Sequence, residues 1–379
     1  MKRIICFIIV FVIMSGFSVA VYGAGNDDAE ILYRKQFSVS GAGGLEDSQP
    51  DETKKLISDM EFSISSTDSL KSFDTKKILS CLMELAAEKS RAPFPAVIIA
   101  FGIMLLCALT GGAGLTLGNG SYQLTLSAVG TIGVCMAVID PVCGIISSAG
   151  EVIQGAAGFM ALYVPVMTGL MISTAREIQG SSYYTLLMGV SEIIGMMSSK
   201  IIFPVIKIFL ALSVTSSLSD SLKISGITNA ICNCVKWVMN FSLGIFVTIL
   251  SAQSLVASSL DDVSARAVRF AVNSFVPYVG GVLGETVSTF SGSLSLLKSG
   301  TGVFIIIASA CMFLPVLMEC IVWRMAFFLL GASAEMLGIS AVKAVMRAIE
   351  TVMSLITAVL LTVLMIFIIS TVVVLIVGK

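Results

Sequence analysis

The chain of 379 residues contains no histidine. Histidine is the usual general base and the commonest metal ligand in proteins, so its absence excludes a Ser-His-Asp or Cys-His catalytic site and any His-containing zinc site. An intramembrane protease or another enzyme would then need paired aspartates, and Asp140 is the only aspartate well inside an apolar run. We therefore expect a non-enzymatic protein without cofactor or metal.

Charged residues are also scarce. They make up 12% of the chain, 56% of the residues are hydrophobic, and the mean hydropathy is +0.98, whereas about 25% of a typical soluble domain is charged. The net charge of -1 provides no strong field to attract nucleic acid. Because hydropathy this high over this length requires lipid as the solvent, we predict an all-α, polytopic helical membrane protein.

Cysteine is present but does not suggest a disulfide framework. Of nine cysteines, only Cys81 lies in the charged segment near the N-terminus, so no intramolecular disulfide is available there. Most of the others lie in apolar runs, where cysteine behaves as a small hydrophobe. Cys232 and Cys234 form a C-x-C pair, which is a weak metal signal by itself.

The few charges are distributed unevenly: residues 25–92 contain 22 of them, and residues 93–379 contain 23. Before this charged segment, Lys2 and Arg3 precede an apolar core over residues 4–17 and several small residues, which is typical of a signal peptide over 1–24. The alternative is an uncleaved anchor helix. Both interpretations place the segment from residue 25 outside the cytoplasm.

Residues 25–92 are predicted to form an extracytoplasmic linker followed by short amphipathic helices. Glycines, Pro50 and many acids are typical of a linker over 25–53. Two helical faces follow, formed by Leu56, Ile57, Met60 and Ile64 and by Ile78, Cys81, Leu82 and Leu85. Helices this small are expected to pack on each other, on the membrane surface or on a partner.

Residues 93–379 are predicted to form the multi-spanning membrane domain. The last candidate span is the firmest, because it contains no charge. Charges interrupt the stretches 183–216 and 303–340, so each of these could be a re-entrant hairpin or two tilted helices, and five to eight crossings are expected. The candidate spans are 94–110, 124–148, 156–175, 183–199, 201–216, 238–257, 303–322, 323–340 and 351–377.

An amphipathic segment over 258–302 interrupts this domain. Ser259 and Asp262 have capping-box spacing, and Asp262 and Arg266 form an i, i+4 pair in the favourable order. Pro277 is expected to stop this helix after Phe275. The segment is predicted to lie at the membrane interface or to plug a vestibule.

Charges inside apolar runs are costly and usually face a cavity or a partner. Asp140 precedes Pro141 in such a run, where it either faces a cavity or marks the end of a shorter helix. Glu319 and Arg324 are predicted to lie near the membrane interface with Trp323 as an aromatic anchor. The candidates are Asp140, Glu192, Lys200, Lys207, Glu285, Glu319 and Arg324.

Several stretches resemble the stage III sporulation protein AE family of endospore-forming bacteria. They are SLSDSLKISG (217–226), Lys236-Trp237, RFAVNSFVPYVGG (269–281) and SLSLLKSGTG (293–302). The signal peptide, the charged start and the overall length resemble this family as well. Arg269, Pro277, Glu285 and Lys298 lie in or beside these stretches and are candidate partner contacts.

The resemblance implies a function that composition does not indicate. Members belong to a multi-protein assembly in the mother-cell membrane around the developing spore, which meets a forespore membrane protein across the intermembrane space. The assembly is thought to form a channel or secretion-like conduit. The resemblance thus implies a permease-like, non-enzymatic subunit whose partners are the other subunits, the forespore protein and the bilayer. The alternative is a self-sufficient secondary transporter for a small solute, suggested by the intramembrane acids and the Pro-containing spans.

Overall fold

A computed structural model of the chain describes residues 35–38, 40–59, 80, 84–85, 87–89, 91–116, 120–173, 177–218, 225–275 and 280–377. The side chains at 111–116, 120–127, 177–179, 218, 225, 254–275, 280–296, 298–299, 373–374 and 376–377 are not part of this description. All regular elements in the described residues are helices, which confirms the predicted all-α class. The predicted signal peptide over 1–24 lies outside the described residues, as does most of the predicted helix over 78–85.

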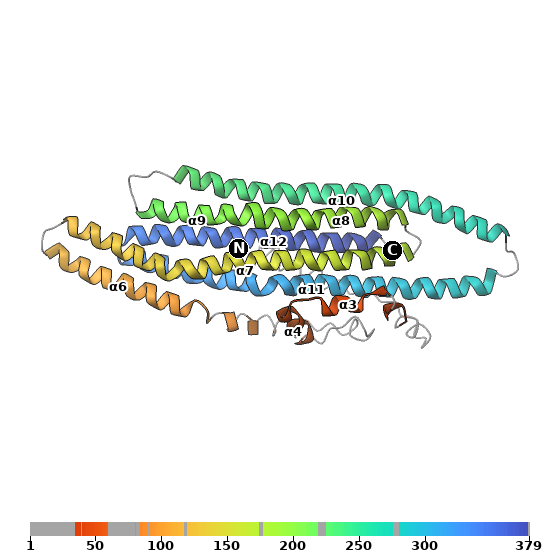
Figure 1. Cartoon of the computed structure of the whole chain (residues 1–379), viewed down its shortest axis with the longest axis horizontal. Coiled ribbons are helices and arrows are strands. Elements are labelled where there is room, and N and C mark those ends of the chain that lie inside the picture. Colours follow the sequence, from red (N-terminus) through yellow and green to blue (C-terminus); the bar gives the residue numbers. More distant parts are fainter. Residues whose placement is uncertain are drawn as a thin grey trace.

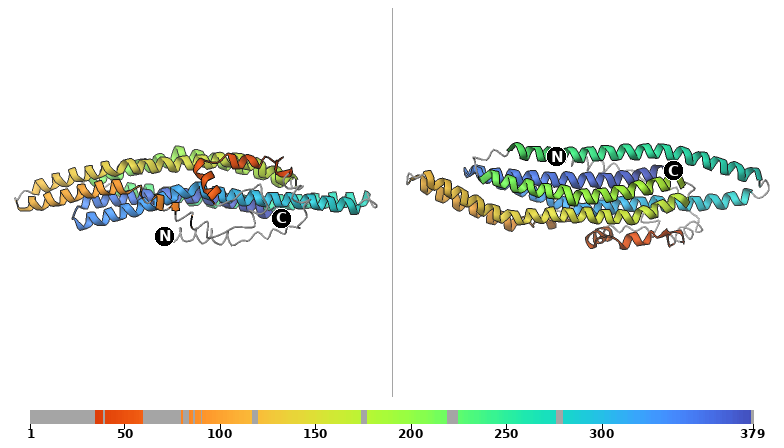
Figure 2. Two further views of the ribbon diagram at one scale, coloured as in Figure 1. Left: turned by 90° about the horizontal axis from the view of Figure 1, so that it is seen from below. Right: turned by 45° about the horizontal axis from the view of Figure 1, so that its top comes forward.

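Long helices along one common axis form an elongated bundle (Figure 1). Both views in Figure 2 show the same arrangement from other sides, and successive long helices run in opposite directions. The pair α6–α7 extends beyond the other helices at one end, and the pair α10–α11 at the other. The helices are α6 (Phe94–Thr116), α7 (Gly120–Ser173), α8 (Glu177–Met197), η1 (Ser198–Ile202), α9 (Phe203–Leu218), α10 (Ser225–Phe275), α11 (Gly280–Met336) and α12 (Ser340–Val377).

Six stretches of the described residues are helical, long and apolar enough to cross a membrane, within the predicted range of five to eight. They are Ala87–Thr110, Ala128–Ser173, Gly180–Ser217, Gly226–Gln253, Gly300–Met336 and Ser340–Val372. The second has 46 residues, which correspond to about 70 Å of helix, whereas the hydrocarbon core of a bilayer is about 30 Å thick. A large part of the bundle must therefore lie outside the hydrocarbon of a single bilayer.

The charge-interrupted spans are continuous helices, so the prediction of separate short spans or re-entrant hairpins is wrong in this part of the chain. The candidates 303–322 and 323–340 share α11 up to Met336, and 124–148 and 156–175 share α7 up to Ser173. A charged side chain leaves the backbone hydrogen bonds of a helix intact. Hydropathy alone therefore does not distinguish an exposed charge on a helix from a break in it.

The candidates 183–199 and 201–216 are also joined, through the π-helical turn η1. The backbone N–H of Phe203 donates to the carbonyl of Ser198, five residues back. Pro204 follows and has no N–H to donate to Lys200, and its ring would clash with that carbonyl in a regular α-helix. The wider turn accommodates the proline without ending the helix.

Helix α12 forms the centre of the bundle and packs against α7, α9, α10 and α11. Against α11, the rings of Phe313 and Phe367 lie 6.2 Å apart, and Gly302 lies beside Leu375. The turn between these two helices is closed by Gly338, whose φ of 73° suits glycine. Many α12 side chains are fully buried, including Val352, Met353, Leu355, Ile356, Val359 and Leu360.

The N-terminal segment packs on the bundle itself. Helix α4 (Asp51–Asp59) lies against α11 and buries Thr53, Leu56 and Ile57, two of which belong to the predicted face. Helix α3 (Gly43–Asp47) lies against α7 and forms within the predicted linker, because Leu45 is buried on the bundle. None of the three packing modes predicted for the short helices included the membrane helices of the chain.

Candidate functional site

The structure places most of the predicted charged candidates on exposed faces of the bundle. Asp140 on α7, Glu192 on α8, Lys200 in η1 and Lys207 on α9 are exposed, and Glu319 on α11 is half-buried. No ion-pair partner for these five side chains is found among the described residues. In water or next to a partner such charges are acceptable, whereas in hydrocarbon each is costly.

Arg324 is the candidate for which the structure provides a partner. Its Nε and Nη2 donate to Oε1 of Glu350 on α12, at 3.4 Å each. The two side chains are 37% and 29% exposed, so the pair is partly shielded between the helices. The sequence analysis missed Glu350, which lies immediately before the charge-free run 351–377.

The prediction that Trp323 is an aromatic anchor at the membrane interface is wrong. Its side chain is buried, 4% exposed, and its ring stacks on Phe327 at 5.3 Å. An aromatic residue beside two charges resembles an interface anchor in sequence, but here the helix turns the indole into the bundle and turns Arg324 outward. Burial depends on which face α12 covers, and local sequence does not provide that.

The candidates from the family-like stretches are placed only in part. Arg269 lies on α10, and Glu285 and Lys298 lie on α11, but their side chains are not among those described. Pro277 lies outside the described residues, and α10 is described up to Phe275. Their roles as partner contacts stay predictions.

One layer of the bundle contains no charge. The Tyr163 hydroxyl on α7 and Ser370 Oγ on α12 lie 3.2 Å apart, and Ser191 Oγ on α8 donates to the Ala157 carbonyl on α7 at 3.0 Å. These contacts, with those between α11 and α12, bring charge-free segments of four helices to one level along the bundle axis, which is about 18 Å thick where the segment on α8 limits it. The segments are 155–173, 180–191, 299–318 and 351–377. The charge-free runs on α7, α11 and α12 have 19 or more residues and approach the thickness of a hydrocarbon core, about 30 Å. The run on α8 is shorter, and α6, whose Ile103 lies beside Gly133 of α7, does not reach this level.

A charged layer lies directly beside the charge-free layer. A Cβ on Gly150 of α7 would lie 3.6 Å from the ring of Phe203 on α9. Counting along these antiparallel helices, Glu151 and Lys200 differ in height by about 3 Å. Glu151 is exposed and was not among the predicted candidates.

The same count extends the charged layer to α12. Helices α7 and α12 run in the same direction (Figure 1). From the Tyr163–Ser370 contact, Asp140 and Glu350 differ in height by about 5 Å. The charged layer therefore contains Asp140, Glu151, Lys200, Lys207, Glu319, Arg324 and Glu350, while Glu192 lies at its boundary with the charge-free layer.

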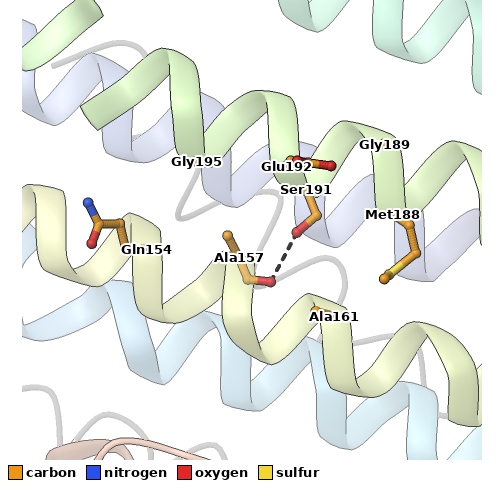
Figure 3. A pocket seen from close by; sticks show the side chains of 8 residues that line it. All are labelled: Gln154, Ala157, Ala161, Met188, Gly189, Ser191, Glu192 and Gly195. Atoms are coloured by element: carbon orange, nitrogen blue, oxygen red, sulfur yellow. Dashed lines mark hydrogen bonds between the residues drawn. The ribbon is translucent and has the colours of Figure 1, made fainter. Parts of the chain in front are cut away.

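A shallow groove of about 430 Å³ lies between α7 and α8 at this boundary (Figure 3). Gln154 stands on the α7 wall and Glu192 on the α8 wall, and the Ser191 hydrogen bond to Ala157 joins the walls. The other lining residues are small or flexible: Ala157, Ala161, Met188, Gly189 and Gly195. The groove offers an amide and a carboxylate but no nucleophile with a neighbouring base.

Among the described residues, no cluster of side chains has the geometry of a metal site. Cys232 is buried and Cys234 is exposed, so the C-x-C pair faces two different environments. No group of three Cys, Asp or Glu side chains gathers among the described residues.

These features define a multi-pass helical membrane protein with a charged layer next to its charge-free layer. The chain belongs to the stage III sporulation protein AE family, whose model matches residues 60–378. It is 23% identical over 158 residues to stage III sporulation protein AE of Bacillus subtilis (strain 168), and this alignment covers 42% of the chain and 40% of the relative. No solved structure matches the chain at a significant level.

Proposed function

We propose that the chain is a non-enzymatic, permease-like membrane subunit of the sporulation complex that links the mother cell and the forespore. The observation that carries this proposal is the family match, which extends over residues 60–378 and so includes the whole helical bundle. A multi-pass bundle is a suitable component for a conduit, since its helices can line or brace a path across the membrane.

The missing histidine supports the non-enzymatic part of the proposal. In the groove between α7 and α8, the Ser191 hydroxyl donates to the Ala157 carbonyl and has no neighbouring base among the described residues. Partners are the other subunits of the complex and a forespore membrane protein across the intermembrane space. The N-terminal segment, packed on α7 and α11, is then on the intermembrane side of the mother-cell membrane.

The direct test is deletion of the gene in the organism that carries it. Sporulation is expected to stop after engulfment, with few heat-resistant spores, while vegetative growth stays normal. A second copy of the wild-type gene at another site is the control and should restore spore yield. A normal yield of spores in the deletion strain would refute the proposal.

The transporter alternative makes a different prediction for the purified protein. A self-sufficient transporter reconstituted in liposomes would move a small solute, and Asp140→Asn would alter its rate. A channel subunit would show no transport until its partner proteins are added. The continuous helices α7 and α11 lend no support to the broken helices that line many transporter sites.

A further inference from the structure

The outer faces of α7 and α9 combine charges with large apolar side chains. On α7, Val129, Ile132 and Met136 are 61%, 47% and 75% exposed and precede Asp140 and Glu151 on the exposed side. In water this face exposes apolar area, and in lipid it exposes charge. A second protein surface with apolar side chains and opposite charges would cover this face better than water or lipid does.

The corresponding face of α9 has the opposite charge. Lys207 on α9 and Lys200 in the preceding turn η1 lie about two helical turns apart on one exposed side, with Ile208 and Ile201 beside them at 54% and 58% exposure. The α7 face, with Asp140 and Glu151, is acidic. None of the four charges has an ion-pair partner within the described residues of its own chain.

The heights of the two faces match. Glu151 and Lys200 differ by about 3 Å along the bundle axis, as counted from the contact between Gly150 and Phe203. Copies of a membrane protein related by rotation about the membrane normal share all heights, and this normal runs along the bundle axis. The acids of one copy and the lysines of another are therefore presented at the same level.

The α7 face also permits close approach of another helix. Gly144 and Gly155 are exposed on either side of Glu151, and nothing lies within 4 Å of a Cβ built on either of them. Small residues let membrane helices approach closely enough for polar side chains to bond across the contact.

We propose that the chain associates with a second copy of itself through these faces, with Asp140 and Glu151 of α7 against Lys200 of η1 and Lys207 of α9. The contact assembles a subunit ring or dimer next to the membrane and neutralises the charged layer. The association proposal rests on the structure of the bundle and not on the proposed sporulation function. A negative deletion test would therefore refute only the function, and a negative association test would refute only the contact between copies.

Charge reversal tests the pairing. Two differently tagged copies are co-expressed and co-purified in mild detergent, with the full chain throughout. Glu151→Lys and Lys200→Glu are each expected to lower the co-purified fraction by about tenfold, because polar contacts between membrane helices are modest but not negligible. The double variant restores complementary charge and should recover most of the association.

A matched control separates this face from a general effect of charge. Lys236 is exposed on α10, a helix that belongs to neither face, and Lys236→Glu should leave association unchanged. Each variant is first shown to be monodisperse with the thermal stability of the wild type. A monomeric wild type, or equal association in all four variants, would overturn the proposal.

Cysteine crosslinking supplies an independent measurement. With exposed Cys234 replaced by serine, Gly155→Cys copies are mixed with Ile201→Cys copies in membranes and oxidised. A crosslinked dimer is expected in the mixture and not with either variant alone, since the contact joins α7 to α9. Association without this crosslink would assign the interface to another face and refute the proposal.

Discussion

The packing of α11 against α12 requires glycine at position 302, because there is no room for a side chain on Gly302. A Cβ at this position would lie 2.4 Å from Cδ2 and 2.7 Å from Cγ of Leu375, so the whole isobutyl group is in the way. Gly302→Ala is expected to lower the stability of the bundle by about 1–3 kcal/mol through overpacking. Thermal unfolding of the purified protein in detergent measures this loss.

Gly244 on α10 provides the matched control for that substitution. It is exposed in the middle of a long helix, and nothing lies within 4 Å of a Cβ built there. Gly244→Ala is expected to be neutral or to stabilise by about 0.5–1 kcal/mol, since alanine loses less backbone entropy in a helix. Equal stability of the two alanine variants would contradict the close approach of α11 and α12 at Gly302.

At the scale of the elements, the pair of α11 and α12 is held in register partly by Arg324 and Glu350. Glu350→Arg places like charges together and is expected to destabilise the bundle by about 1 kcal/mol, a modest figure because both side chains are partly exposed. Combining it with Arg324→Glu restores an ion pair and should recover stability. Denaturation of the wild type, both single variants and the double variant gives the coupling energy.

A coupling energy of zero in that cycle would show that the two side chains do not interact. Thr351→Ala serves as a neighbouring control, because its hydroxyl bonds only the Arg347 carbonyl of its own helix. It is expected to change stability little, by about 0.5 kcal/mol or less.

Local signals in the sequence predicted much of this architecture. The buried Leu56 and Ile57 of α4 and the apolar helix α12 follow from periodicity and hydropathy within short windows. Each of these depends on residues close together in the chain, where propensity and side-chain pattern act directly.

Short stretches of sequence do not show the register between helices that are distant in the chain. The pairing of Arg324 with Glu350, the burial of Trp323 and the matched heights of Glu151 and Lys200 all depend on how distant helices pack. The continuity of α11 through Glu319 was missed for the same reason, since hydropathy treats an outward-facing charge as the end of a span. Packing, rather than propensity, decides each of these features.

At the scale of the whole molecule, two features orient the bundle. Helix α6 follows the N-terminal segment and α7 runs antiparallel to it, and Val166, at the middle of the charge-free layer of α7, is the neighbour of Gly41 in the N-terminal segment. If the signal-peptide prediction holds, the Ser173 end of α7 is therefore the extracytoplasmic end. Helix α12 runs in the same direction as α7, so its Val377 end lies at that same end of the bundle, and the charged layer lies toward the cytoplasm.

Thiol labelling in intact cells and in inverted vesicles tests this arrangement. Single cysteines replace Asp140, Lys207 and Leu162 in a background without native cysteines, and a membrane-impermeant maleimide is added from either side. In the Glu151→Lys background, which separates the copies, the cysteines at 140 and 207 are expected to react only from the cytoplasmic side, because the charged layer is wetted there. The cysteine at 162 should stay unlabelled, since Leu162 is exposed on α7 within the charge-free layer and faces lipid. Strong labelling at 162 would place the hydrocarbon elsewhere, and labelling of 140 from outside would reverse the orientation.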